Sequence, residues 1–113
     1  MSHRVSQVSA LIRTLVSKSM RAEIEFPEGL MVTVSDVVVG PDLKHARVMV
    51  SILPENRTDE ALNILAAHRG RIQQDVAGEL TMKFSPRISF RPDDSQERAS
   101  KIDALIDSVR SDS

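Results

Sequence analysis

The chain has 113 residues, a net charge of −1 with 16 acidic and 15 basic side chains, and no cysteine. This length fits one domain, and the absence of cysteine excludes a disulfide framework and a thiolate metal site. The sequence shows no signal-peptide pattern and no apolar run long enough to span a membrane, so we expect a cytoplasmic protein without a membrane association.

The charges are arranged in alternating blocks. Residues 1–21 contain four basic residues and no acid, and residues 69–91 contain five basic residues and two acids. Residues 22–68 contain three bases against eight acids, and residues 92–113 contain three against six. A fold that brings the two basic blocks together would present a basic face despite the neutral total. Ordinary solvated surface is the simpler alternative.

The first predicted element is a helix over roughly residues 4 to 24. Its apolar side chains recur at three- and four-residue spacing from Val5 to Met20, which is typical of an amphipathic helix. Pro27 and Gly29 then predict a turn.

The next two elements are predicted strands. The run MVTVSDVVV, residues 31–39, is rich in β-branched residues, and its alternation slips at Asp36, which predicts a β-bulge near Ser35 and Asp36. HARVMVSI, residues 45–52, alternates cleanly with its even-numbered side chains on one face. The short turn at residues 40–43 predicts an antiparallel hairpin.

A helical pattern follows over residues 58–82, with Asn56 as a candidate N-cap. The stretch AAHRGRI, residues 66–72, interrupts its apolar pattern and predicts a break or kink in the helix. Residues 87–91 alternate as a third strand, with Ile88 and Phe90 inward. The sequence PDDS then begins a last amphipathic helix that extends to about Val109.

The element order is therefore helix, strand, strand, kinked helix, strand, helix. A helical connection between the second and third strands allows these strands to be parallel. The sequence predicts a small α+β domain, in which a three-stranded mixed sheet carries its helices on one face.

Three segments resemble the ribosome-binding factor A family. The hairpin VTVSDVVVGPDLKHARVMVSIL at residues 32–53 is similar to the hairpin of that family, and SHRVSQVSALIRTLV at residues 2–16 is similar to its first helix. The run from residue 62 to residue 95, which includes FSPRISFRPDDS, is similar to its kinked helix and third strand. The resemblance covers about residues 2–110 and implies a type II KH-like fold. Residues 1–110 are expected to form one RNA- and ribosome-binding domain, and residues 111–113 a frayed tail.

The resemblance also implies a function. Members of this family bind the free small (30S) ribosomal subunit, assist the maturation of its 16S rRNA late in assembly, and support growth in the cold. The expected partners are the small subunit and 16S rRNA, with ribosomal proteins and an assembly GTPase as further candidates. A monomer without enzymatic activity, cofactor or bound metal is expected.

The segment His68-Arg69-Gly70 corresponds to the kink of the family. A KH domain carries a Gly-x-x-Gly loop between two helices, where backbone N–H groups meet phosphates. The family replaces this loop with an Ala-x-Gly kink, and His68 stands here at the alanine position. Residues 67–70 can alternatively form a degenerate four-residue loop. Arg69 and Arg71 are expected to be exposed and to offer their charge to phosphate.

The candidate RNA-binding residues are Arg13, Lys18, Arg21, Arg69, Gly70, Arg71, Lys83, Arg87 and Arg91. Period-two spacing places Arg87 and Arg91 on the outward face of the third strand, and Arg47 can share that face. For each arginine, the alternative is an ordinary solvated side chain, and for Gly70 a simple helix-break residue. The sequence predicts no exposed aromatic residue, so binding through phosphate contacts and shape is expected rather than base stacking.

Two other classes of function are alternatives to an RNA-binding assembly factor. A protein–protein interaction module would use the hairpin edge or the acidic segment 55–60, which is also a candidate contact for basic ribosomal proteins. An enzyme has no support, because the sequence lacks a readable nucleophile–base arrangement and a phosphate-loop lysine. His3, His45 and His68 lie in different elements without metal-ligand spacing.

Overall fold

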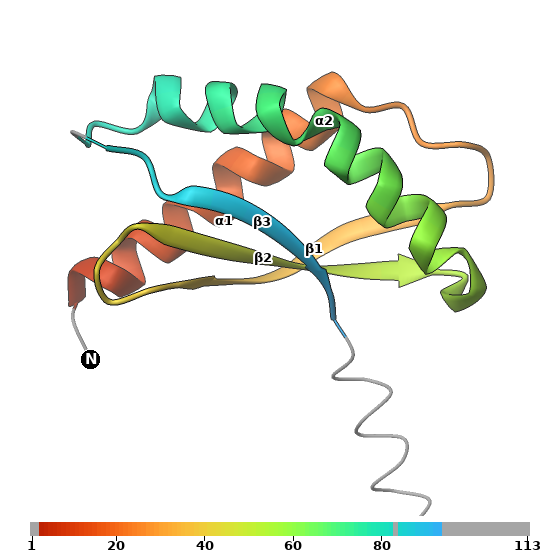
Figure 1. Cartoon of the computed structure of the whole chain (residues 1–113), viewed down its shortest axis with the longest axis horizontal. Coiled ribbons are helices and arrows are strands. Elements are labelled where there is room, and N and C mark those ends of the chain that lie inside the picture. Colours follow the sequence, from red (N-terminus) through yellow and green to blue (C-terminus); the bar gives the residue numbers. More distant parts are fainter. Residues whose placement is uncertain (1–2, 83, 94–113) are drawn as a thin grey trace, which may run out of the picture.

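The computed structural model describes residues 3–82 and 84–93 (Figure 1). Its elements are α1 (His3–Glu23), β1 (Met31–Val39), β2 (His45–Leu53), the 3-10 turn η1 (Glu55–Arg57), α2 (Thr58–Glu79) and β3 (Arg87–Pro92). The boundaries of α1 and of the strands agree with the predicted ones to within one residue. The predicted last helix, the C-terminal tail and Lys83 lie outside the described residues.

The three strands form one mixed sheet in the order β1-β2-β3. β1 and β2 pair antiparallel, and β2 and β3 pair parallel, as the short hairpin and the helical connection predict. The predicted bulge is confirmed, since the register passes from Val34 opposite Val50 to Asp36 opposite Met49. Ser35 is left out of the pairing, and its hydroxyl donates to the Met49 carbonyl at 3.2 Å. The extra residue keeps Asp36 on the exposed face.

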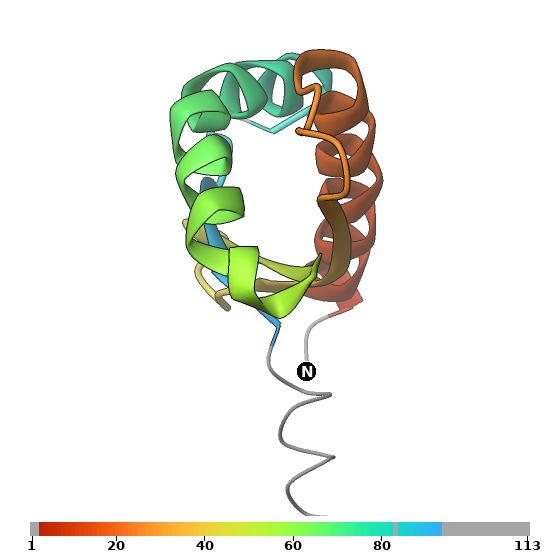
Figure 2. The ribbon, with the colours of Figure 1, turned by 90° about the vertical axis from the view of Figure 1, so that its right-hand side faces the viewer.

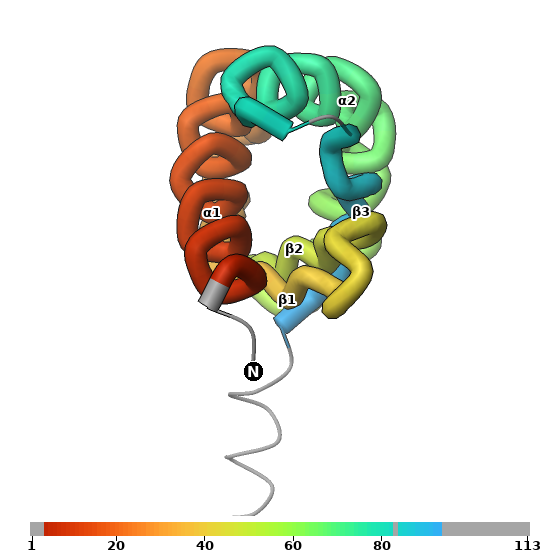
Figure 3. Tube along the Cα trace, turned by 90° about the vertical axis from the view of Figure 1, so that its left-hand side faces the viewer, coloured from red at the N-terminus to blue at the C-terminus, as the bar shows by residue number. Residues whose placement is uncertain are grey.

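Both helices cover the same face of the sheet, as Figures 2 and 3 show from the two ends of the domain. α1 packs against β1, and α2 packs against β3. The core between the two layers is aliphatic, and its fully buried members include Ile12 and Val16 of α1, Val48 of β2 and Ile72 of α2. Burying each such side chain stabilises the fold by about 1.5–3 kcal/mol, so the helix layer is held mainly by apolar contact.

The second helix is continuous, so the predicted break at residues 66–72 is wrong, as is the alternative of a loop at residues 67–70. α2 runs without interruption from Thr58 to Glu79, and its axis changes direction near its middle (Figure 1). Leu65 and Ile72 are both buried. These two residues lie seven positions apart, about two helical turns, so the core-facing stripe passes through the segment, and the residues between them are exposed or half-buried. The kink is therefore a bend within a helix.

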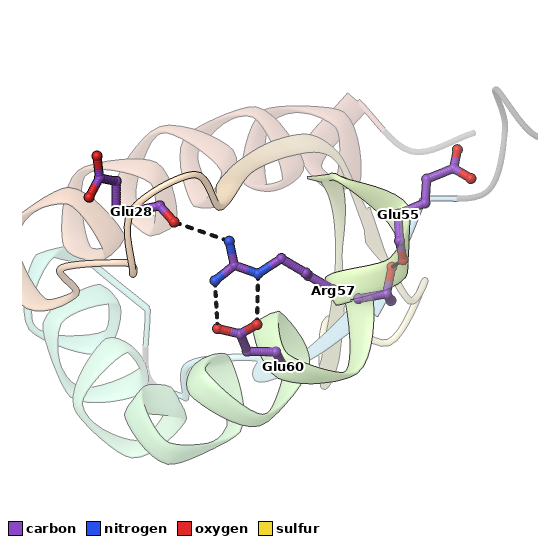
Figure 4. A network of polar contacts seen from close by, with 5 residues as sticks. Glu28, Glu55, Arg57 and Glu60 are labelled. Atoms are coloured by element: carbon purple, nitrogen blue, oxygen red, sulfur yellow. Dashed lines mark hydrogen bonds and ion pairs between the residues drawn. The ribbon is translucent and has the colours of Figure 1, made fainter.

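The start of α2 also differs from its prediction. Asn56 lies inside η1 and does not cap the helix; Arg57 occupies the N-cap position and forms no side-chain cap bond. Instead the Arg57 guanidinium donates to both carboxylate oxygens of Glu60 at 2.8 Å each, and to the Glu28 carbonyl at 3.1 Å (Figure 4). This network joins the α1–β1 connection to the first turn of α2. The helix ends before Leu80, earlier than the predicted boundary at residue 82.

Candidate nucleic-acid interface

The structure divides the candidate cations between two surfaces. Five of these cations lie in the helix layer, namely Arg13, Lys18 and Arg21 on α1, with Arg69 and Arg71 on α2. Arg87 and Arg91 lie on β3, where period-two alternation with the buried Ile88 turns them to the opposite side of the sheet. The second basic block of the sequence is therefore divided, and only its helical part lies in the same layer as the first block.

Two of the helix-layer cations are held by carboxylates. Lys18 Nζ lies 3.2 Å from Glu79 Oε1, which links α1 to the end of α2. Arg71 Nε lies 3.4 Å from Glu23 Oε2 and 3.6 Å from Asp75 Oδ1. Exposed ion pairs of this kind contribute about 0–1 kcal/mol each to stability. A phosphate that approached Lys18 or Arg71 would compete with these carboxylates.

Two of the kink residues, His68 and Arg69, make hydrogen-bond contacts within the domain that the sequence did not predict. Arg69 is half-buried rather than exposed, and its Nη1 donates to the Ile88 carbonyl at 3.5 Å. His68 Nδ1 lies 2.8 Å from the carbonyl oxygen of Ile64, one turn earlier in the same helix. Gly70 is exposed, with open space where a side chain would be. His68 thus contacts its own helix, and Arg69 links α2 to β3.

Gln73 is a structural side chain that sequence reasoning did not identify. Its amide oxygen accepts a hydrogen bond from the Ile88 N–H at 2.8 Å. Its amide nitrogen donates to the Pro86 carbonyl at 2.9 Å and to the Ser85 hydroxyl at 3.1 Å. Gln73 therefore fixes the start of β3 against α2. The sequence signal was weak, because a glutamine beside an apolar stripe is common on solvated helix faces.

The outward face of the sheet carries three exposed arginines, which confirms that Arg47 shares this face with Arg87 and Arg91. In the register, Arg47 lies opposite Ser89, and Arg91 lies opposite Met49. Within residues 3–82 and 84–93, none of the three arginines has an ion-pair partner. Among the residues of the three strands, Asp36 is the acid on this face, and its Oδ1 accepts the Val37 N–H at 2.8 Å. Among the described residues no helix covers this face, which we call the open face of the sheet, and its arginines are therefore the sheet cations most accessible to phosphate (Figure 2).

The expectation of no exposed aromatic residue is wrong at one position. Phe84, which precedes β3, is 76% exposed, whereas Phe26 and Phe90 pack against the core. The ring lines a pocket of about 290 Å³ together with Arg4 and Lys44. Strand alternation with Ile88 predicted that Phe90 points inward, but Phe84 precedes the strand, where no periodic pattern indicates whether a ring is buried.

A larger groove of about 570 Å³ lies between the end of α1 and β1. Its lining is mainly apolar and includes Met20, Ile24 and Val32, with Arg21 as its cation. The described residues contain no group of three His, Cys, Asp or Glu side chains placed to hold a metal ion. Neither described helix is long and apolar enough to cross a membrane.

The fold and these surfaces define a class of protein, a type II KH-like α+β domain with its helices on one face of a mixed sheet. The family model for ribosome-binding factor A matches residues 4–106. The ribosome-binding factor A of Cereibacter sphaeroides is 39% identical over 108 residues, which cover 93% of this chain and 77% of the relative. The chain belongs to the ribosome-binding factor A family.

Solved structures of the family share the fold. The crystal structure of ribosome-binding factor A from Thermus thermophilus gives a TM-score of 0.68 at 24% identity, covering 78% of this chain and 93% of that one. A homology model of the Thermus thermophilus factor, fitted into a cryo-EM map of its complex with the 30S subunit, gives a TM-score of 0.65 at 23% identity. It covers 84% of this chain and 97% of the Thermus chain.

Proposed function

We propose that this protein binds the free small (30S) ribosomal subunit and assists the maturation of its 16S rRNA late in assembly, including during growth in the cold. The observation that carries the proposal is the family match over residues 4–106. The complex of the Thermus relative with the 30S subunit supports the choice of partner. The protein acts in the cytoplasm as a monomeric binder, with residues 1–110 as its binding domain, and not as an enzyme.

Such a factor works by binding one conformation of its target better than another. A ligand shifts a conformational equilibrium only by its difference in affinity for the two states. A binder that favours the mature arrangement of an rRNA segment therefore promotes maturation without chemistry of its own. Ribosomal proteins are further partners under this proposal, and an assembly GTPase would promote release.

The surface charges suggest how the protein would contact rRNA. Phosphate contacts supply much of the affinity of nucleic-acid binders, and they weaken as salt rises. The nine predicted residues are the candidate contacts. The described cations among them differ in whether a carboxylate of the domain already pairs with them. Lys18 and Arg71 have carboxylate partners, whereas Arg87 and Arg91, together with Arg47, project from the open face of the sheet. The open-face arginines are therefore the first candidates for phosphate.

The first test is co-sedimentation of the purified protein with free small subunits, free large subunits and joined ribosomes across a salt series. We expect preferential binding to free small subunits, which weakens as salt rises. Equal binding to all three particles, or binding that does not depend on salt, would contradict the proposal. It would favour a protein-interaction module that shares only the fold.

A second test addresses maturation. Cells that lack the factor should accumulate precursor 16S rRNA and grow slowly in the cold, and the parent chain should restore both phenotypes. Restoration by a variant that does not bind small subunits would contradict a role that depends on this binding.

A further inference from the structure

Three segments that are distant in the sequence form a pocket at one end of the domain. These segments are the start of α1, the turn between β1 and β2, and the connection from α2 to β3, which lie at the same end in Figure 1. The pocket has a volume of about 290 Å³. Small-ligand sites typically have volumes of about 300–1,000 Å³, so this pocket lies at the lower end of that range and suits one small group.

Phe84 supplies an aromatic surface to this pocket. Its side chain is 76% exposed, the largest exposed fraction among the bulky apolar residues of the described chain. Met82 and Leu43 line the same pocket and are partly buried against the core. The exposed ring therefore stands beside an apolar floor, an arrangement that suits a flat, partly apolar ligand. Every nucleobase offers such a face for stacking on an aromatic side chain.

Two cations from different elements line the same pocket. Arg4 comes from the first turns of α1, and Lys44 comes from the hairpin turn, and both are exposed. Neither has an ion-pair partner within the part of the chain that the structure describes. Asp42 also lines the pocket, and its Oδ1 accepts the Lys44 backbone N–H at 3.0 Å. The charge of the pocket is thus net positive, which favours an anionic ligand.

The turn that carries Lys44 has a specific backbone conformation. Leu43 has a φ of 60°, which places it in the left-handed region. Its N–H donates to the Gly40 carbonyl at 2.9 Å, and the Gly40 N–H donates to the His45 carbonyl at 3.0 Å. These bonds fix the turn, so Lys44 is presented by a well-defined backbone.

The third strand begins beside the pocket. The Arg87 N–H donates to the Lys44 carbonyl at 2.8 Å, so β3 begins at the edge of the pocket. Arg91 follows Arg87 on the same side of the strand, about 13 Å further along at 3.3 Å per residue. A phosphodiester chain that lies along these arginines would bring a nucleotide to Phe84.

We propose that this pocket binds one unpaired nucleotide of RNA, with the base stacked on Phe84 and the adjoining phosphates contacted by Arg4 and Lys44. The inference rests on the proposed function for the source of the RNA, the rRNA of the small subunit. It adds a contact with a base to a surface whose other proposed contacts are all between cations and phosphates. Because stacking is tolerant of sequence, the pocket recognises an unpaired base rather than a particular one.

The first experiment measures the affinity of F84A, F84W and L11A for purified small subunits over a salt series. Removing a stacked ring costs about 5- to 150-fold in affinity, so F84A should bind at least about fivefold more weakly than the parent. Its salt dependence should be unchanged, because no charge is lost. F84W should bind like the parent, since it keeps an aromatic face. Leu11 is 45% exposed on α1 and lies away from the pocket, so L11A is the matched loss of an exposed apolar side chain and should bind like the parent.

Substitution of the two cations, unlike that of Phe84, should change the salt dependence of binding. The double variant R4Q/K44Q should weaken binding and reduce the slope of log K against log[salt] by about 1.4, at about 0.7 per single-strand phosphate contact. A loss of affinity with an unchanged slope would contradict the phosphate contacts. The double variant R4K/K44R keeps both charges and should bind within about threefold of the parent.

The second experiment uses fluorescence. The natural chain has no tryptophan, so the indole introduced by F84W is the sole one. A single-stranded oligoribonucleotide of mixed sequence should quench this indole and protect it from acrylamide, whereas L11W should show neither effect. A perfectly paired RNA duplex should quench F84W much less.

The outcomes separate the two proposals. Quenching of F84W by the oligoribonucleotide supports the nucleotide pocket even if the parent protein shows no preference for small subunits, a result that would overturn only the proposed function. Subunit binding by the parent with equal affinity for F84A, and no quenching of F84W, overturns the pocket alone. Weaker binding by F84A without quenching by RNA also overturns it, because the ring would then contact protein.

Discussion

The side-chain oxygen of Gln73 accepts a hydrogen bond from the backbone N–H of Ile88 at 2.8 Å. The amide nitrogen of the same side chain donates to the Pro86 carbonyl at 2.9 Å. One helix residue thus satisfies two backbone groups at the start of a strand on the sheet edge. Both Pro86 and Ile88 are buried, so water cannot easily replace these bonds.

We expect Q73A to destabilise the domain by about 1–3 kcal/mol, because the Ile88 N–H loses its partner and the Pro86 carbonyl keeps only the longer bond from the Ser85 hydroxyl, at 3.4 Å. The measurement is urea unfolding followed by circular dichroism. Gln74 is exposed on the same helix, and Q74A should change the free energy of unfolding by less than about 0.5 kcal/mol. Equal stabilities of Q73A and Q74A would show that the bonds of Gln73 contribute nothing net.

A second prediction concerns Gly70. The glycine lies in a continuous helix, its φ is not positive, and open space surrounds the position of an added Cβ. G70A should therefore stabilise the domain by about 0.5–1 kcal/mol. Gly29 has a φ of 83°, and its added Cβ would lie 3.4 Å from Arg57 Nη1, so G29A should destabilise by about 1–2 kcal/mol. Thermal unfolding of both variants checks this contrast. A destabilised G70A would mean that the bend in α2 needs glycine.

The third prediction concerns pH. The hydrogen bonds from Arg57 hold the pKa of Glu60 below its ordinary value, and Glu60 raises the pKa of Arg57. Since the pKa of Glu60 is lower in the folded state, its contribution to stability is present above its unfolded pKa and is lost as pH falls through the folded pKa. R57Q should raise the pKa of Glu60, which NMR titration of the carboxyl carbon measures. R47Q, on the outer face of the sheet, should leave it unchanged. No change in R57Q would mean that the bidentate contact does not persist in solution.

The fourth prediction concerns the arginines of the open face. The triple variant R47Q/R87Q/R91Q should bind small subunits at least about tenfold more weakly, with the slope of log K against log[salt] reduced by about 2. R47K/R87K/R91K keeps the charges and should lose much less affinity. Co-sedimentation across a salt series gives both quantities, and thermal unfolding verifies the fold. Unchanged binding of the glutamine variant would leave these arginines as solvated surface.

Much of the fold follows from local pattern. The nine residues of β1 and the position of its bulge follow from β-branched residues and from one misplaced aspartate, because alternation of period two decides which side chains reach the core. The parallel pairing of β2 with β3 follows from the helical length between them. Arg47, Arg87 and Arg91 share one face for the same reason, and this part of the candidate surface was predictable.

The sequence predicted an irregularity in α2, but not that the helix would bend without a break. A glycine among polar residues suggests a break when it is viewed locally. In the folded chain, Leu65 and Ile72 are both buried in one core, and that burial holds the backbone helical across the polar segment. Tertiary packing outweighs a propensity difference of about 1 kcal/mol at Gly70.

The sequence by itself determined the family, through the resemblance of its motifs, and the order of the elements from α1 to β3, because that order depends on periodic patterns along the chain. Only the tertiary structure decided which cations are paired, that Gln73 fixes the start of β3, and that Phe84 is exposed beside Arg4 and Lys44. These features depend on distances between segments up to about eighty residues apart in the chain, and such distances arise only when the helices and the sheet pack together.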